Sequence, residues 1–212
     1  MAPVDLALLF VLDCSASVTL EEFALMAGGS GAALRDPEVA AGLLGGERGA
    51  TLAALLLFSG PEAQLVSLPW TRLDSAGKVE QFAADLEDTP REVRGTSTAI
   101  GSALLACEAL LADLPAPAAR RVIDVAGDGR ANDGLAPAPV RDRLAAAGVT
   151  INGLCVLHEE PDLVASYTQE VIGGPGAFAL PCPDYAAFAE AMRQKLVREV
   201  AAMAPRRPVR GA

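Results

Sequence analysis

The chain of 212 residues contains 51% hydrophobic and 21% charged residues. This length and composition supply enough apolar surface for one well-filled domain and exclude global disorder. Lysine and arginine total 17 against 27 aspartates and glutamates, a formal net charge of -10. Because such a charge repels phosphate groups, we expect no nucleic-acid partner.

The N-terminal segment and the apolar runs bear on membranes and on the cellular compartment. The longest uncharged apolar run, residues 6–12, is far shorter than the ~20 residues that a membrane-spanning helix needs. The start Met-Ala-Pro-Val-Asp lacks the basic residues that precede the apolar part of a secretion signal. We therefore expect no membrane span and a cytoplasmic protein, or a periplasmic or extracellular one if the N-terminus has been trimmed.

Four widely spaced cysteines form neither a zinc-binding pattern nor the dense pattern of a disulfide-bonded secreted domain. They are Cys14, Cys107, Cys155 and Cys182. We expect all four to be reduced and structural. Cys14 is singled out because it precedes a predicted helix, where the thiolate form is favoured.

Apolar runs of strand length alternate with helical patterns, which is typical of an α/β domain with a mainly parallel sheet. In the first half of the chain we expect strands over residues 4–12, 52–58 and 63–70, and helices that begin near residue 19 and cover residues 79–86. The connection before the third strand is too short for a crossover, so this strand is predicted to be antiparallel at a sheet edge. Gly28, Gly29 and Gly31 predict that the first helix kinks or ends early.

The second half continues the alternation after a polar loop over residues 88–98. We expect helices over residues 100–114, 140–147 and 185–200, and strands over residues 122–126, 149–157 and 178–180. The complete prediction is a doubly wound α/β domain over residues 1–202, with a mostly parallel central sheet, one antiparallel edge strand and helices on both faces. The basic tail, residues 203–212, has no apolar period and is expected to be frayed.

Small polar residues follow the first strand in the run Asp13-Cys14-Ser15-Ala16-Ser17. Open α/β sheets bind ligands at the carboxyl ends of their parallel strands, so this run is a candidate binding loop. Ser17 is also explained as an ordinary helix N-cap, and that alternative stays open.

Two further loops are predicted to reach the same point. Arg94-Gly95-Thr96-Ser97-Thr98 opens a helix, and Gly127-Asp128-Gly129 ends a strand. Two alternatives stay open here. In one, Thr98 is only an N-cap and Thr96 or Ser97 faces the site; in the other, Asp128 only forms a turn. Asn132 and Asp133 either line the rim or belong to a solvated loop, and Asp124 is expected to pair inside the protein.

Two carboxylates and several hydroxyls are oxygen ligands of low total charge. Such ligands suit a hard divalent cation, Mg2+ or Mn2+, better than zinc or copper, which prefer sulfur or imidazole. His158 is the only histidine, which excludes a site with several histidine ligands.

On these motifs the chain resembles the von Willebrand factor A domain with its metal-ion-dependent adhesion site, across residues 4–200. The matching segments occur in the family's order: the run 13–17, Thr98 before Ala99-Ile100-Gly101, and Asp128-Gly129. Residues 121–129, 151–154 and 171–178 are most similar to a bacterial subgroup of unknown function. The resemblance implies that Ser15, Ser17 and Thr98 bind the metal directly, and that Asp13 and Asp128 hold it mainly through water.

The resemblance also implies that one coordination position is left for an acidic residue of a partner. We therefore expect a metal-dependent protein-binding module for adhesion or assembly, without enzymatic activity, in which the cation bridges to an Asp or Glu of a partner protein. Alternatives are a scaffold domain with a vestigial site, a serine hydrolase using Ser97 and His158, and a phosphatase with Asp13 as nucleophile. Ala99 departs from the motif of the serine hydrolase, and Ser15 departs from the motif of the phosphatase.

Overall fold

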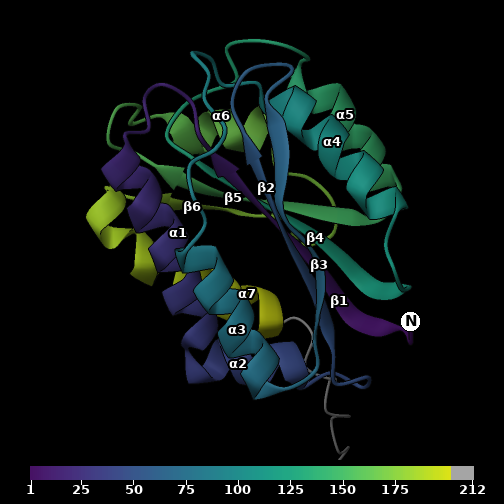
Figure 1. Ribbon diagram of the computed structural model, residues 1–212. Helices are drawn as coiled ribbons and strands as arrows, with labels where there is room; N and C mark the ends of the chain where they lie inside the picture. The colour runs from purple at the N-terminus through teal and green to yellow at the C-terminus, as the bar shows by residue number, and fades with distance from the viewer. Residues whose placement is uncertain (202–212) are drawn as a thin grey trace, which may run out of the picture.

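A six-stranded sheet forms the centre of the protein, whose computed structural model describes residues 1–201 (Figure 1). The strands are β1 (Val4–Asp13), β2 (Thr51–Phe58), β3 (Gln64–Leu73), β4 (Ala118–Gly127), β5 (Val149–Val156) and β6 (Ala179–Cys182). They lie in the order β3-β2-β1-β4-β5-β6, and every neighbouring pair is parallel except β2 and β3. The predicted sheet with an antiparallel edge strand is confirmed.

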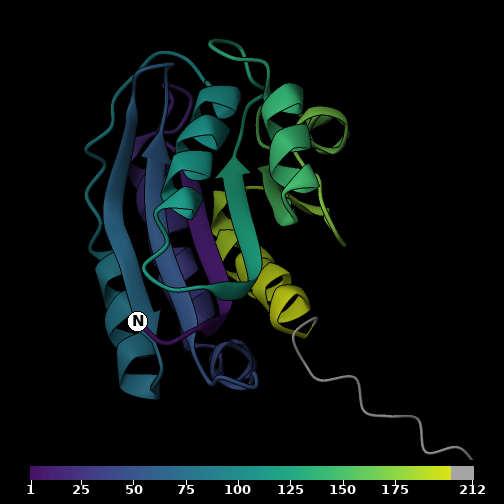
Figure 2. The ribbon, with the colours of Figure 1, turned by 90° about the vertical axis from the view of Figure 1, so that its right-hand side faces the viewer.

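Helices cover both faces of the sheet. One face carries α1 (Leu20–Arg35), α2 (Pro37–Leu44), α3 (Ala76–Glu87) and α7 (Phe188–Ala201), and the other carries α4 (Ile100–Ala112), α5 (Pro137–Ala146) and α6 (Leu163–Glu170). In Figure 2 the helices α4 and α5 lie in front of the sheet. The doubly wound architecture predicted from the alternation is therefore confirmed.

The central strand β1 shows why continuous apolar runs form this sheet. All ten of its residues are buried, and its side chains alternate between two cores. Phe10 and Leu12 pack toward α1 and α7, whereas Leu9 and Val11 pack toward α4 and α5. A strand covered on both faces needs apolar side chains at successive positions, which is the pattern that the sequence shows.

Helix α1 corrects one prediction, because it runs unbroken from Leu20 to Arg35 through its glycines. A Cβ at Gly29 would come within 2.8 Å of Phe188 Cδ1. The glycine therefore permits close packing of α1 against α7, which offsets its low helix propensity. The helix begins at a capping box of Thr19 and Glu22.

Two short helices, α2 and α6, were not predicted. Each has eight residues and buries only two side chains: Val39 and Leu43 in α2, Leu163 and Tyr167 in α6. Strand β4 also begins at Ala118, earlier than the predicted residue 122, because its first residues are only partly buried. Both errors come from segments in which few apolar positions mark the structure.

A buried charge cluster joins the sheet to α7. Lys195, fully buried, lies 2.5 Å from Asp124 Oδ1 and 2.7 Å from Glu199 Oε1. Asn152 Nδ2 donates to the same Glu199 oxygen at 2.7 Å. The predicted internal pairing of Asp124 is confirmed. Burial, followed by the charge of Glu199, raises the pKa of Asp124 well above its ordinary value.

Both edge strands of the sheet contain a proline, Pro69 in β3 and Pro181 in β6. The pairing of β3 with β2 is also irregular around Leu55. Proline has no N–H to donate, so it is tolerated at sheet edges and not in central strands.

The described residues contain no helix long and apolar enough to cross a membrane. The predicted domain end at residue 202 and the basic tail over residues 203–212 lie outside the described residues.

Candidate metal centre

The candidate site lies where the direction of winding changes. From β1 the chain proceeds to β2 and β3 at one edge, then returns to β4 beside β1 and continues to β5 and β6 at the other edge. The carboxyl ends of β1 and β4 therefore border the crevice in which open α/β sheets bind ligands. Asp13 is the last residue of β1, and Asp128 directly follows β4.

The β1–α1 loop brings two serine hydroxyls to Asp128. Ser15 N donates to Asp13 Oδ1 at 2.7 Å, which turns the loop sharply after the strand. Ser15 Oγ and Ser17 Oγ are 3.1 Å apart, and Ser17 Oγ donates to Asp128 Oδ1 at 2.8 Å. Thr19, not Ser17, caps helix α1, so the interpretation of Ser17 as an N-cap is wrong.

Thr98 comes from the loop before α4 and reaches the same crevice. Its Oγ1 lies 3.6 Å from the position that a Cβ of Gly129 would occupy. Thr98 N donates to Asn132 Oδ1 at 2.8 Å, and Asn132 N donates to Thr98 O at 3.0 Å. Asn132 therefore ties the Thr98 loop to the loop that follows β4.

The alternatives for these two loops do not fit the structure. The N-cap of α4 is Ala99, with no side-chain hydrogen bond, so Thr98 is not a cap. Thr96 is exposed, and Ser97 Oγ donates to Asp133 Oδ2 at 2.9 Å. Asp128 is buried and accepts the Ser17 hydrogen bond, which is more than a turn former needs. The structure thus brings together all five predicted residues: Asp13, Ser15, Ser17, Thr98 and Asp128.

Arg91 also contacts the β1–α1 loop, although the sequence pattern did not point to it. Its Nη2 donates to Cys14 O at 3.0 Å and to Ser15 O at 2.7 Å. The guanidinium thus fixes the backbone between Asp13 and Ser17 from the loop that also carries Thr98. Nothing in the sequence separates Arg91 from the neighbouring Arg94, because the distinction depends on a contact between distant segments.

The electrostatics of the site are dominated by two buried carboxylates. Asp13 is 0% exposed and Asp128 is 2% exposed. Burial raises the pKa of Asp13 to about 7, against the lowering effect of its hydrogen bonds with Ser15, and the nearby charge of Asp128 raises it further. Two buried carboxyl groups at one crevice favour an additional cation, which would stabilise their ionised forms.

The free polar atoms of the crevice show whether a divalent cation fits. Asp13 Oδ2 and Asp128 Oδ2 are buried and have no hydrogen-bond partner among the described residues, and the same is true of the Tyr167 and Tyr185 hydroxyls. A Cβ at Gly127 would come within 2.9 Å of Asp13 Oδ2, so glycine keeps this space open. Within residues 1–201 no three His, Cys, Asp or Glu side chains cluster as metal ligands. The donors are carboxylate and hydroxyl oxygens, which suit Mg2+ or Mn2+.

Cys14 corrects the expectation of a thiolate beside the site. Its side chain is 0% exposed, and burial, with the nearby charge of Asp13, raises its pKa to about 12. The helix N-terminus is too weak an influence to overcome this burial. The other cysteines are also buried and free.

The hydrolase interpretation lacks its central interaction. The Ser97 hydroxyl donates to Asp133, and among the described residues no hydrogen bond joins Ser97 to His158. His158 is exposed at the end of β5. A serine nucleophile needs a base within hydrogen-bond reach, and this pair does not provide one.

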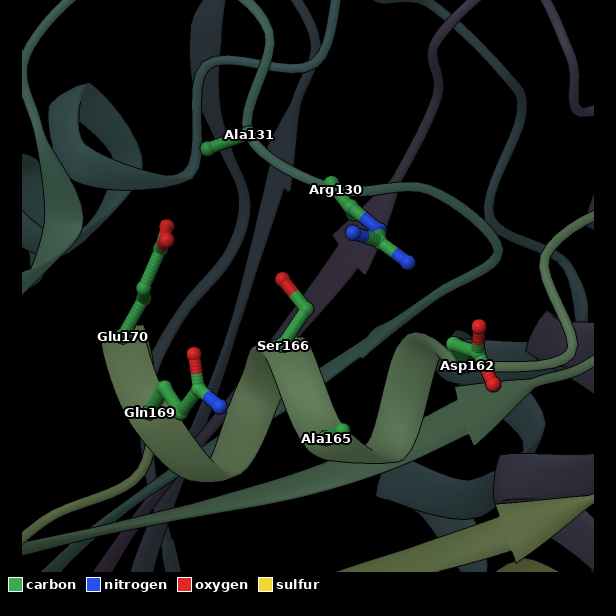
Figure 3. Close-up of a pocket in the computed structure, with 7 residues that line it drawn as sticks. All are labelled: Arg130, Ala131, Asp162, Ala165, Ser166, Gln169 and Glu170. Atoms are coloured by element: carbon green, nitrogen blue, oxygen red, sulfur yellow. The ribbon is translucent and has the colours of Figure 1, made fainter.

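A polar pocket of about 340 Å³ lies beside the site, between the loop after β4 and helix α6. In Figure 3 the side chains of Ser166 and Glu170 point from α6 toward the loop that carries Arg130 and Ala131. Arg130 pairs with Glu160 at 2.7 Å. The rim around Asp128 is therefore recessed and charged, with no large apolar lining.

Solved structures show that the fold is that of von Willebrand factor A domains. The von Willebrand factor domain of the type V pilus tip protein Mfa5 from Porphyromonas gingivalis superposes with a TM-score of 0.65 and 11% identity, covering 96% of this chain and 98% of that one. Proximal thread matrix protein 1 from the mussel byssus, solved with zinc in its metal-ion-dependent adhesion site motif, gives a TM-score of 0.64 and 19% identity over 94% of this chain and 48% of that one.

A third structure, an aerotolerance-related membrane protein from Bacteroides fragilis, gives a TM-score of 0.55 and 16% identity, covering 91% of this chain and 99% of that one. Residues 3–204 match a family model, and the chain belongs to the family described as "Protein of unknown function (DUF1194)". The chain spans about half the length of the byssus protein that it resembles. No curated protein matches the sequence.

Proposed function

We propose that this protein is a metal-dependent protein-binding module. Ser15, Ser17 and Thr98 bind Mg2+ or Mn2+ through their hydroxyls, and Asp13 and Asp128 hold the cation mainly through water. An Asp or Glu carboxylate of a partner protein takes the remaining position. The observation that carries the proposal is the convergence of these five side chains at the winding switch point, with two buried carboxylate oxygens that have no hydrogen-bond partner among the described residues.

The chain's own residues explain why an acidic group is the expected ligand. Three of the five side chains are neutral hydroxyls. The two carboxylates also accept hydrogen bonds within the protein, Asp13 from Ser15 N and Asp128 from Ser17 Oγ. A cation with few anionic ligands keeps much of its positive charge and supplies a Lewis-acidic position for a carboxylate. The net charge of -10 repels an acidic partner at long range, so recognition is local and association is slow at low salt.

Adhesion or assembly is the role that the similar structures suggest for such a module, since they include a pilus tip protein and a byssus matrix protein. Catalysis is not part of the proposal, because the crevice contains no histidine and both carboxylates face the cation position. The competing proposal is a scaffold domain whose site is vestigial, and metal binding separates the two.

Metal binding is tested by thermal denaturation with Mg2+ or Mn2+ against EDTA. The wild type should be stabilised by about 2.7 kcal/mol when the cation is at a hundredfold excess over its Kd. Asp13→Ala and Thr98→Ala should abolish the response, whereas the control Thr96→Ala should keep it because Thr96 is exposed. An equal response in wild type and Asp13→Ala would refute the assignment of the site.

Partner binding is tested by affinity capture with Mg2+ and with EDTA, followed by identification of the captured protein. EDTA and Asp128→Ala should each eliminate capture, and replacing one acidic residue of the captured protein should reproduce the loss. The exposed Asp113→Asn, at the end of α4 farthest from the site, is the control that should leave capture intact. Undiminished capture in EDTA would favour the scaffold proposal. The cytoplasmic location expected from the sequence is checked by cell fractionation.

A further inference from the structure

The chain has only two tyrosines, Tyr167 and Tyr185, and both hydroxyls are buried beside the candidate metal centre. Tyr167, in α6, belongs to the core on the α4–α6 side of the sheet. Tyr185 begins the short 3-10 helix η1 (Tyr185–Ala187) and belongs to the core on the α1–α7 side. The two side chains therefore reach the carboxyl end of the sheet from opposite faces.

Tyr167 borders the same small space as Asp13. A Cβ at Gly127 would lie 2.9 Å from Asp13 Oδ2 and 3.2 Å from Tyr167 Oη. Neither atom has a hydrogen-bond partner among the described residues, although both are buried. The absence of a side chain at Gly127 leaves these two polar atoms facing one shared space.

Tyr185 supplies a second buried hydroxyl, from the other face of the sheet. Its hydroxyl and Asp128 Oδ2 are both buried without a hydrogen-bond partner among the described residues. Burial and then the negative charge of Asp128 raise the pKa of Tyr185 above its ordinary value. The site thus has two free carboxylate oxygens and two free tyrosine hydroxyls, and Tyr167 shares the space at Gly127 with Asp13.

Four buried polar atoms of this kind are complementary. A tyrosine hydroxyl has a proton to donate, and an ionised carboxylate only accepts. Leaving either unpaired inside a protein is costly, whereas a direct hydrogen bond or a bridging water satisfies both. Around metal ions, such donors fix the orientation of the carboxylates that hold the ion.

We propose that Tyr167 and Tyr185 are positioning residues of the metal centre. Their hydroxyls donate to the free oxygens of Asp13 and Asp128, directly or through one water, and hold the two carboxylates in place beneath the cation from both sides of the sheet. This inference rests on the proposed metal site. It adds that the donated hydrogen bonds draw negative charge away from the cation, which strengthens its attraction for a carboxylate of the partner.

The variants Tyr167→Phe and Tyr185→Phe remove only the hydroxyls. Each should raise the Kd for Mg2+ or Mn2+, measured by calorimetry on the full chain, by about 10-fold to 100-fold. In EDTA each variant should melt only slightly below the wild type, because a single hydrogen bond contributes little net stability. The control is Thr51→Val: Thr51 Oγ1 donates to Leu43 O at 2.8 Å, and Thr51 begins β2, at the opposite end of the sheet from the site. This control should melt earlier in EDTA and bind the metal unchanged.

A spectroscopic measurement separates positioning from a general structural role. Protein labelled with 3-fluorotyrosine should give two 19F signals, which the Phe variants assign, and Mg2+ should shift both. If the wild type binds Mg2+ but neither signal moves and both Phe variants bind as the wild type does, this inference is overturned while the metal site stands. Phe variants that melt earlier than the Thr51→Val control in EDTA but bind the metal as the wild type does would also overturn it. If the wild type binds neither cation, the proposed function fails as well.

Discussion

The metal-free protein should lose stability as the pH rises, because Asp13 is buried without a full counter-charge. Its pKa is raised from the ordinary 3.8 to about 7, mainly by burial. Well below pH 3.8 the carboxyl is protonated in both the folded and the unfolded protein, and burial carries no charge penalty. Above pH ~7 it is charged in both, and the folded state carries the whole penalty. The difference of about 3 pKa units corresponds to about 4 kcal/mol.

Asp13→Asn removes this charge and keeps an oxygen that accepts from Ser15 N. In EDTA, urea denaturation of the variant and the wild type should agree near pH 4. The variant should become more stable by about 4 kcal/mol at pH 8, which corresponds to roughly 10 °C in Tm. Excess Mg2+ should stabilise only the wild type, which reduces the difference in stability between the two proteins.

The control for this experiment is Asp162→Asn, an exposed carboxylate at the start of α6. It should follow the wild type within about 0.5 kcal/mol at every pH. The reasoning is refuted if the difference in stability between the wild type and Asp13→Asn is the same at pH 4 and pH 8. That result would mean that burial does not raise the pKa of Asp13.

Three further predictions concern the core. Lys195→Met leaves Asp124 and Glu199 buried without their cation and should lower the free energy of unfolding, measured in urea, by about 3–5 kcal/mol. A loss of less than about 1 kcal/mol at neutral pH would show that the buried charge cluster does not stabilise the fold. Gly29→Ala places a Cβ 2.8 Å from Phe188 Cδ1 and should destabilise by about 1–3 kcal/mol. Its matched partner Gly28→Ala meets nothing within 4 Å and should stabilise by about 0.5–1 kcal/mol, so equal Tm shifts would argue against the α1–α7 contact. All four cysteines should react with a thiol reagent only after unfolding, because they are buried and burial raises the pKa of Cys14 and Cys155 to about 12; rapid reaction of the native protein at pH 8 would show that a thiol is accessible.

The sheet was predictable from the sequence because its central strands are apolar on both faces and alternate with longer periodic segments. Helices α2 and α6 were not, since each has only two buried side chains to mark a period. The continuity of α1 was missed for a different reason. Its glycines weaken the helix locally, and the close approach of distant segments, Phe188 at Gly29 and Ala83 at Gly31, compensates for two of them.

Some residues of the candidate site could be predicted from the sequence, and others could not. Asp13 and Asp128 adjoin the ends of predicted strands, so their meeting follows from the topology of a parallel sheet. Arg91 and the tyrosines act through contacts between segments that lie far apart in the chain. Tyr185 was predicted, but only as an apolar position of the last helix, because periodicity describes where a side chain is buried and not what its hydroxyl faces.

The prolines of the two edge strands limit the ways in which another chain can associate with this protein. A strand laid along β3 or β6 would meet a position without an N–H, at Pro69 or Pro181, and β6 has only four residues with which to pair. Extension of a sheet from one molecule to the next needs an unbroken row of donors and acceptors. Neither edge presents one, so fibre-like growth through the backbone is disfavoured, and specific association is left to the side chains and loops at the ends of the strands.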